Sequence, residues 1–165
     1  MRWAAIGMGA NLPSRAGEPS ETLRRAAEEL SALGEEFRLS SLYKTRPVSV
    51  AEQPEFVNAA AVFRTALQPE ELLLKLLAIE RNYGREREFC IPNGPRTLDL
   101  DLLLMEGVVC SSTRLVLPHP RLHLRRFALL PLAEIAPFLL HPTLGVEIAE
   151  LLARLPVEDG DVVRL

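Results

Sequence analysis

Two segments with helical periodicity constrain the fold of this sequence more than any other feature. In residues Pro19–Leu33 the apolar side chains recur at helical spacing, and Gly34 follows the last of them. The same pattern occurs in Pro69–Tyr83, and Gly84 follows it. Proline is favoured in the first turn of a helix and glycine just after its last turn. The sequence therefore predicts two amphipathic helices with defined ends.

Strand-like segments surround and separate these two helices. Residues 2–9, 36–45, 56–66 and 98–104 are short, apolar or alternating, and bounded by turn residues. The predicted order is strand, helix, strand, strand, helix, strand. This order is typical of a ferredoxin-like arrangement, an antiparallel sheet with helices packed on it. We therefore expect an α+β fold.

The C-terminal third predicts helical additions to this arrangement. Residues 117–137 favour a helical segment, and a short helix is expected around residues 146–155. Together with the two earlier helices, these additions predict a three-layer α/β/α arrangement. The 165 residues contain no internal repeat, and their number suits a single domain spanning 1–165.

Charge and cysteine content exclude some classes of protein. The formal net charge of −3 argues against binding to nucleic acid or to an anionic membrane through bulk charge. Cys90 and Cys110 have no CxxC or Cys/His spacing, which indicates a reducing compartment and no structural zinc. The segment RWAAIGMGA is too short for a secretory signal, and no run of 18 apolar residues occurs. A cytoplasmic location is expected.

The predicted strand at 98–104 places two acids on one face. Because strand side chains alternate, one face is expected to hold Leu98, Leu100, Leu102 and Leu104, and the other Asp99, Asp101 and Leu103. With α-carbons about 7 Å apart, the two carboxylates could hold one or two hard cations. The alternative is a solvated face on which acids happen to alternate.

Basic residues flank the two aspartates. Arg85 and Arg87 lie in the loop GREREFCIPNGPR, and Arg96 ends it. Guanidinium groups bind phosphate oxygens through a planar fork of donors, and phosphoryl transfer needs cationic stabilisation beside its metal ions. The loop alone would be typical of solvated charge, but its position next to the aspartates favours a phosphate site.

A second group of candidates surrounds the sequence PHPRLHLRRF. His119, between two prolines, is the better candidate for donating a hydrogen bond to phosphate, whereas His123 is more typical of a surface residue. Phe56 and Phe127 lie beside polar loops. Such rings usually belong to a core, but two of them could sandwich a flat heterocycle.

Five motifs, in order, resemble the 6-hydroxymethyl-7,8-dihydropterin pyrophosphokinase family of folate synthesis. They are YKTRP at 43–47, QPEFVNAA at 53–60, Glu80 with GRER at 84–87, GPRTLDLD at 94–101 and LPHPRLHLRRF at 117–127. The resemblance covers about residues 3–140, and GPRTLDLD is its most specific part. It implies transfer of the terminal diphosphate of ATP, as a unit, to the hydroxymethyl oxygen of the pterin. The implied products are AMP and the pterin diphosphate.

The resemblance also implies roles for residues at matched positions. The implied catalytic residues are Arg85, Arg96, Asp99 and Asp101, and the two aspartates would hold two Mg²⁺ ions. The implied ATP site adds Glu80, Arg87, Arg114, His119 and Arg125. The implied pterin site consists of Thr45, Pro47, Val48, Phe56, Asn58 and Phe127. The family resemblance further suggests a monomer that acts on two small molecules, with neither nucleic acid nor membrane as a partner.

Two other functions are considered. A nucleic-acid-binding module could use a ferredoxin-like sheet, but it predicts aromatic residues in the central strands and a basic surface. Aromatic residues make up 5% of this sequence, and its net charge is negative. The second alternative keeps the magnesium site in another phosphotransferase or a nucleotide hydrolase. The nucleotide product discriminates among these reactions, since AMP indicates diphosphate transfer or cleavage between the α- and β-phosphates, and ADP indicates transfer of one phosphoryl group.

Overall fold

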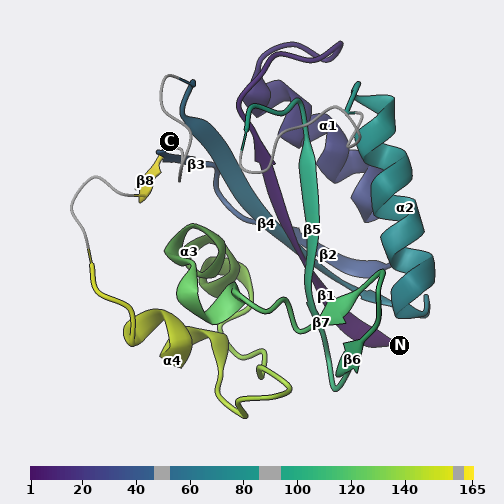
Figure 1. Ribbon diagram of the computed structural model, residues 1–165, viewed down its shortest axis with the longest axis vertical. Coiled ribbons are helices and arrows are strands. Elements are labelled where there is room, and N and C mark those ends of the chain that lie inside the picture. The colour runs from purple at the N-terminus through teal and green to yellow at the C-terminus, as the bar shows by residue number, and fades with distance from the viewer. Residues whose placement is uncertain (47–52, 86–93, 158–161) are drawn as a thin grey trace.

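The computed structural model describes residues 1–46, 53–85, 94–157 and 162–165. The first part of the chain forms β1 (Arg2–Ala10), α1 (Pro19–Ser31), β2 (Glu35–Leu39), β3 (Tyr43–Thr45), β4 (Phe56–Thr65), α2 (Pro69–Asn82) and β5 (Asp99–Met105). The rest forms β6 (Cys110–Ser111), β7 (Val116–Leu117), the 3₁₀ helix η2 (Leu122–Leu124), α3 (Arg126–Ile135), α4 (Ile148–Ala153) and β8 (Val162–Arg164). Figure 1 shows these elements in place. None of the described helices combines the length and the apolar character that crossing a membrane requires.

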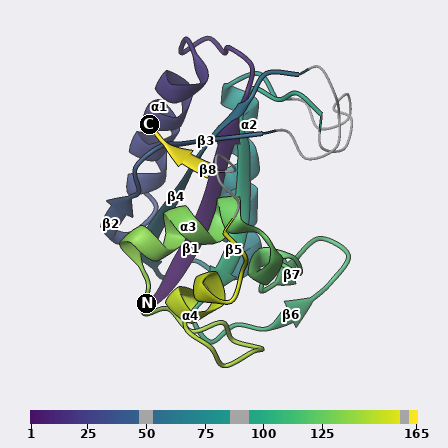
Figure 2. The same cartoon turned by 90° about the vertical axis from the view of Figure 1, so that its left-hand side faces the viewer.

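The main sheet has the strand order β5-β1-β4-β3-β8, and β2 also pairs with β4. Its strand pairs are antiparallel. Helices α1 and α2 cover one face, while α3, with α4 beside it, lies on the other (Figure 2). The predicted α+β class, ferredoxin-like arrangement and three layers are therefore confirmed.

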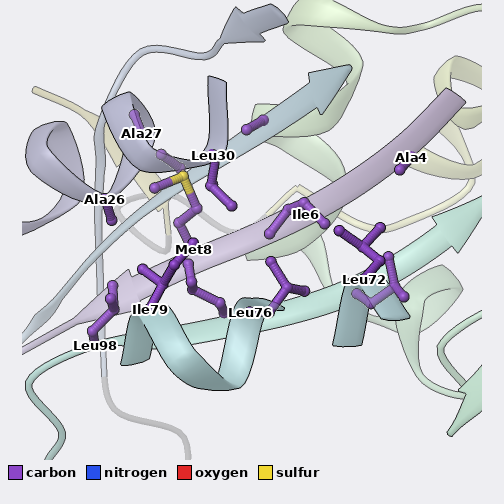
Figure 3. Close-up of a cluster of buried hydrophobic side chains, with 14 of the residues drawn as sticks. Ala4, Ile6, Met8, Ala26, Ala27, Leu30, Leu72, Leu76, Ile79 and Leu98 are labelled. Atoms are coloured by element: carbon purple, nitrogen blue, oxygen red, sulfur yellow. The ribbon is translucent and has the colours of Figure 1, made fainter. Parts of the chain in front are cut away.

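The alternation of side chains on β1 divides the core between the two faces. Ala4, Ile6 and Met8 point toward α1 and α2, where they meet the buried leucines of both helices (Figure 3). Ala5 points the other way and belongs to the cluster under α3. The central strand is thus buried on both faces, which explains why the segment is apolar almost throughout.

The face assignment of β5 is correct except at one residue. Leu98, Leu100 and Leu102 pack in the cluster of α1 and α2, as predicted, but Leu104 lies in the cluster under α3. The register with β1 shifts between the pairs Ala5↔Leu104 and Ile6↔Leu102. This β-bulge adds one residue to β5, which reverses the alternation beyond it.

The predicted strand at 36–45 consists of two strands, β2 and β3, separated at Ser40. The Ser40 N–H donates to the Ala60 carbonyl at 2.9 Å, while the Ala60 N–H donates to Ser40 Oγ at 2.8 Å. The hydroxyl oxygen of Ser40 thus accepts the hydrogen bond that a backbone carbonyl would accept in a regular strand pair with β4. The pairs Leu39↔Ala61 and Tyr43↔Asn58 show that one extra residue is accommodated between them.

Three short strands were not predicted. β6 and β7 form a small hairpin of their own, and β8 pairs with β3 at the edge of the main sheet. Strands of two or three residues are too short to show a period in the sequence. β7 includes Leu117, the first residue of the predicted helical segment 117–137. Helical structure in this segment begins later, at η2.

Candidate functional site

Two adjoining cavities open between the main sheet and the beginning of α3. Both are lined by Gly9, Asn58, Asp99, Asp101, Arg125 and Phe127. The first also reaches Thr45, Arg46, Phe56 and Arg96, and the second reaches Gly7, Leu103 and His119. Most of the predicted site residues that the structure describes therefore meet in one place.

The floor of these cavities is formed by β5 and β1. Asp99 and Asp101 point to the same face, as predicted, and their partners on β1 are Gly9 and Gly7. A side chain at Gly9 would place its Cβ 2.7 Å from Asn58 Oδ1. The side chains of Asn58 and Leu103 therefore pack closely over the two glycines, and both carboxylates line the cavities.

Two guanidinium groups converge on the carboxylate of Asp99. Arg85 Nη1 binds Asp99 Oδ1, and Arg96 Nη1 lies 3.2 Å from Asp99 Oδ2. Arg85 is buried, and its Nη1 also donates to the Leu98 carbonyl at 3.1 Å. Positive charge is therefore concentrated at the same end of β5 as the paired acids.

Glu80 of α2 lies behind this group. Its side chain is buried, and Oε2 accepts a hydrogen bond of 2.7 Å from the Leu100 N–H and lies 3.4 Å from Arg85 Nη1. Glu80 does not line either cavity. Its expected place in the ATP site stays a prediction. The contacts of Glu80 described here are with Arg85 and with the backbone of β5.

Aromatic rings stand on two sides of the first cavity. Phe56 begins β4, and Phe127 lies in the first turn of α3. Each ring has an arginine over it: Arg96 Cζ is 5.9 Å from the Phe56 centroid, and Arg125 Cζ is 5.5 Å from that of Phe127. The structure thus brings together two rings that are far apart in the sequence.

Two buried polar residues lie at the sheet side of this cavity. Asn58 and Thr45 are both buried, and Asn58 Nδ2 donates to Thr45 Oγ1 at 2.5 Å. This bond fixes the rotation of the Asn58 amide, so its remaining donor and acceptor capacity has a defined direction. Arg46, which the sequence analysis does not single out, lines the same cavity.

His119 lines the second cavity. Its Nδ1 accepts a hydrogen bond of 3.1 Å from the Arg121 N–H. Burial, together with the charges of Arg125 and Arg121, lowers the pKa of His119 below its usual value of 6.5. At neutral pH the imidazole is therefore uncharged and bears its proton on Nε2, which leaves that atom as a donor. Burial also lowers the pKa of Arg125.

Asn11 is a site residue that sequence reasoning missed. Its Oδ1 accepts from the Arg96 N–H at 2.8 Å, while Nδ2 donates to Gln53 Oε1 at 2.8 Å and to the Pro54 carbonyl at 3.0 Å. One buried amide thus joins the end of β1 to the residues that precede β4 and β5. Its position directly after Gly-x-Gly-Ala, at the end of a predicted strand, was the available signal.

Besides Glu80, two predicted residues that the structure describes, Arg85 and Arg114, line neither cavity. Arg114 is exposed in the turn between β6 and β7 and lines neither cavity, so its ATP role stays a prediction. Pro47, Val48 and Arg87 lie outside the described residues.

Residues 5–137 match the family model described as 7,8-dihydro-6-hydroxymethylpterin-pyrophosphokinase (HPPK). The chain is 41% identical over 155 residues to a 2-amino-4-hydroxy-6-hydroxymethyldihydropteridine pyrophosphokinase of Pseudomonas aeruginosa, covering 93% of this chain and 91% of that one. It is 40% identical over 151 residues to the enzyme of the same name from Synechocystis sp., covering 90% and 74%.

The fold is also found in a larger protein of known structure. The crystal structure of wild-type Plasmodium falciparum HPPK-DHPS with SDX-DHP matches with a TM-score of 0.66 at 15% identity. The match covers 93% of this chain and 43% of that one, so this chain spans less than half the length of that protein.

Proposed function

This chain belongs to the 7,8-dihydro-6-hydroxymethylpterin-pyrophosphokinase family, and we propose that it transfers diphosphate from ATP to 6-hydroxymethyl-7,8-dihydropterin. The products are AMP and the pterin diphosphate, an intermediate of folate synthesis. Because the diphosphate moves as a unit, the attacking hydroxymethyl oxygen bonds to the β-phosphorus of ATP, and the bond between that phosphorus and the α,β-bridging oxygen breaks.

One observation supports this proposal above the others. Asp99 and Asp101 open into a cavity that also contains Phe56 and Phe127. Paired carboxylates suit a metal-bound phosphate chain, and paired aromatic rings suit a flat heterocycle. A site with both features accommodates a nucleotide phosphate and a pterin side by side.

The two aspartates are proposed to hold two Mg²⁺ ions. Their oxygen donors suit this cation, which uses few protein ligands and takes the others from phosphate and water. Bound Mg²⁺ neutralises phosphate charge and assists ionisation of the attacking hydroxyl. Both carboxylates line the two cavities, where a phosphate chain can reach them.

The arginines and His119 are proposed to hold the phosphates. Arg85 and Arg96 present planar donor groups at the carboxylate of Asp99, where the transferred diphosphate would lie. Uncharged His119 donates from Nε2 to a phosphate oxygen, and Arg125 lines both cavities together with the two aspartates. These groups stabilise the negative charge that moves onto the leaving AMP.

The aromatic residues and Asn58 are proposed to hold the pterin. Phe56 and Phe127 stack on its two faces, and Asn58, held by Thr45, forms hydrogen bonds with the edge of the ring. A stacked ring excludes water from the hydroxymethyl group, which limits transfer of diphosphate to water. Pro47 and Val48 are proposed to complete this end.

A product analysis tests the function directly. Purified protein is incubated with Mg²⁺, ATP and the pterin, with a control that lacks the pterin, and nucleotides and pterins are separated by chromatography. Pterin-dependent AMP together with a pterin diphosphate is the expected result. Formation of ADP, or AMP formed equally without the pterin, would show another phosphotransferase or a hydrolase.

The proposal extends to the cellular location and the oligomeric state. The net charge of −3 argues against nucleic acid or an anionic membrane as a partner, and the family resemblance supports a cytoplasmic monomer. Size-exclusion chromatography with light scattering measures the oligomeric state.

A further inference from the structure

The first cavity, in which the pterin is proposed to bind, has two walls that come from different layers of the molecule. Thr45, Phe56 and Asn58 lie on β3 and β4, whereas Arg125 and Phe127 lie at the beginning of α3. The width of the cavity therefore depends on how α3 sits on the sheet; Figure 2 shows the helix lying on this face.

An apolar cluster joins α3 to the sheet. Ala128, Leu129 and Leu132 belong to the same buried cluster as Ala60 and Val62 of β4. Apolar burial stabilises this layer but has no preferred direction, so by itself it tolerates small rotations of the helix about its axis.

Glu134, in the last turn of α3, provides directional contacts. Its carboxylate accepts hydrogen bonds from the Tyr43 hydroxyl at 2.6 Å, and from the Ser41 N–H and Oγ at 3.0 Å each. Tyr43 is buried in β3, between Asn58 of β4 and Arg164 of β8. Tyr43, the partner of Glu134 on the sheet, therefore lies in a strand that is paired on both sides, with β4 and with β8.

Phe127 and Glu134 share one face of α3. They are seven residues apart in the sequence, which in a helix corresponds to about two turns. A rotation of α3 that broke the contact of Glu134 with Tyr43 would also move the Phe127 ring. Near the same end of the helix, Arg38 Nη1 donates to the Ile135 carbonyl at 3.2 Å.

We propose that Tyr43 and Glu134 are positioning residues for the pterin: together they fix the rotation of α3, and with it the distance of Phe127 from the opposite wall. Neither residue lines either of the two site cavities. The pair therefore affects the pterin only by positioning the residues that line them. This inference rests on the proposed function, because the pterin ring is the ligand whose fit the pair would set.

The protonation states of Tyr43 and Glu134 preserve the hydrogen bond between them at neutral pH. Burial and the neighbouring Glu134 raise the pKa of Tyr43 to about 12, so its hydroxyl remains a donor. Burial acts to raise the pKa of Glu134, but the hydrogen bonds from Tyr43 and Ser41 hold it below the usual 4.5. The pair therefore keeps its donor and its charged acceptor throughout the neutral range.

Tyr43→Phe removes the bond with little change of shape. We expect the KM for the pterin to rise about fivefold, the effect of losing one hydrogen bond, while the KM for ATP changes less than about twofold. The matched control is Tyr83→Phe. Tyr83 is also buried, burial and its bond to Glu29 raise its pKa to about 12, and it packs on the opposite face of the sheet. This control should leave both KM values unchanged.

A second variant tests whether the two residues act together. Glu134→Gln should also raise the KM for the pterin, and the double variant should be no worse than Glu134→Gln alone, because the bond that Tyr43→Phe removes is one of the bonds of Glu134. A general loss of structure would instead lower the melting temperature and the active fraction without affecting the pterin selectively. An unchanged KM for the pterin in Tyr43→Phe, or an equal rise for ATP, would overturn the proposal.

The wild-type assay separates this inference from the proposed function. If the wild-type protein forms no AMP in response to the pterin, the proposed function fails. The pair is then judged by crystal structures of the wild-type protein and Tyr43→Phe. A displaced Phe127 ring would support positioning, and an unmoved ring would overturn it.

Discussion

Glu80 Oε2 accepts a hydrogen bond of 2.7 Å from the backbone N–H of Leu100, the residue between Asp99 and Asp101. Among the strands that the structure describes, β5 lies at the edge of the sheet, so none of them accepts hydrogen bonds from its outward N–H groups. The same carboxylate oxygen lies 3.4 Å from Arg85, which itself binds Asp99. One buried acid of α2 therefore supports both the strand and the arginine of the candidate site.

Glu80→Ala should destabilise the fold substantially. The substitution leaves the Leu100 N–H without this acceptor and removes a buried negative charge beside Arg85, which is expected to cost about 3 kcal/mol of unfolding free energy. Urea unfolding measures this cost. The control is Glu21→Ala, whose partner Arg24 lies 2.8 Å away with both side chains 57% exposed. That change should cost less than about 0.5 kcal/mol, and an equal cost for both variants would contradict the role of Glu80.

Asp99→Asn and Asp101→Asn should each lower turnover by about 100-fold or more, because an amide is a poor ligand for Mg²⁺ and loses the negative charge. Removing the metal with a chelator should abolish AMP formation in the wild-type protein, and added Mg²⁺ should restore it. Glu106→Gln, just beyond the other end of β5 and outside both site cavities, is the control and should keep full turnover. Unchanged turnover in either aspartate variant, with an unchanged circular dichroism spectrum, would exclude that residue as a ligand.

Phe127→Leu should weaken binding of the pterin and spare ATP. Loss of one stacked ring is expected to raise the KM for the pterin about tenfold, whereas Phe127→Tyr keeps a ring and should change it less. Steady-state kinetics with each substrate varied in turn measures both constants. Phe138→Leu provides the comparison, since that ring contacts Trp3, at the far end of β1, with centroids 5.8 Å apart. A similar KM for the pterin in the Phe127 and Phe138 variants would argue against stacking.

Stability should fall as the solution is acidified below about pH 6.5. Burial and the nearby His123 lower the pKa of His141 below 6.5, so in this range the unfolded chain binds more protons than the folded one. Protonation therefore favours unfolding until the pH reaches the lowered pKa. The lowered pKa of His119 makes stability depend on pH in the same direction. The lowered pKa of Glu134 also stabilises the fold, and this contribution is lost only as the pH falls below 4.5, the usual pKa of a glutamate.

His141→Asn tests this dependence. His141 is buried, and its Nδ1 accepts from the Leu144 N–H at 3.1 Å, a bond that an asparagine oxygen can replace. The variant should lose less unfolding free energy than the wild-type protein between about pH 7 and about pH 5. Urea unfolding at both pH values measures the difference, and an identical loss in the two proteins would show that His141 does not contribute.

Local patterns in the sequence predicted much of the fold and part of the site. The period of the side chains placed Asp99 and Asp101 on one face of a strand, and this depends only on strand geometry. The order of helices and strands indicated the arrangement of the sheet. By contrast, no local pattern relates Phe56 to Phe127, which lie far apart in the chain. Their places beside polar loops raised a shared site as one possibility, and the family resemblance assigned it.

The sequence by itself determined which side chains share a face within each long strand or helix, because that depends on the period of the backbone alone. Tertiary structure decided the rest: the bulge that turns Leu104 to the other face, the strand β8, and the contacts of Glu80 with Leu100 and of Glu134 with Tyr43. Each of these depends on a register or a hydrogen bond between segments distant in the chain. Such contacts form only when the layers pack, because the partner of each polar group is fixed by the packing.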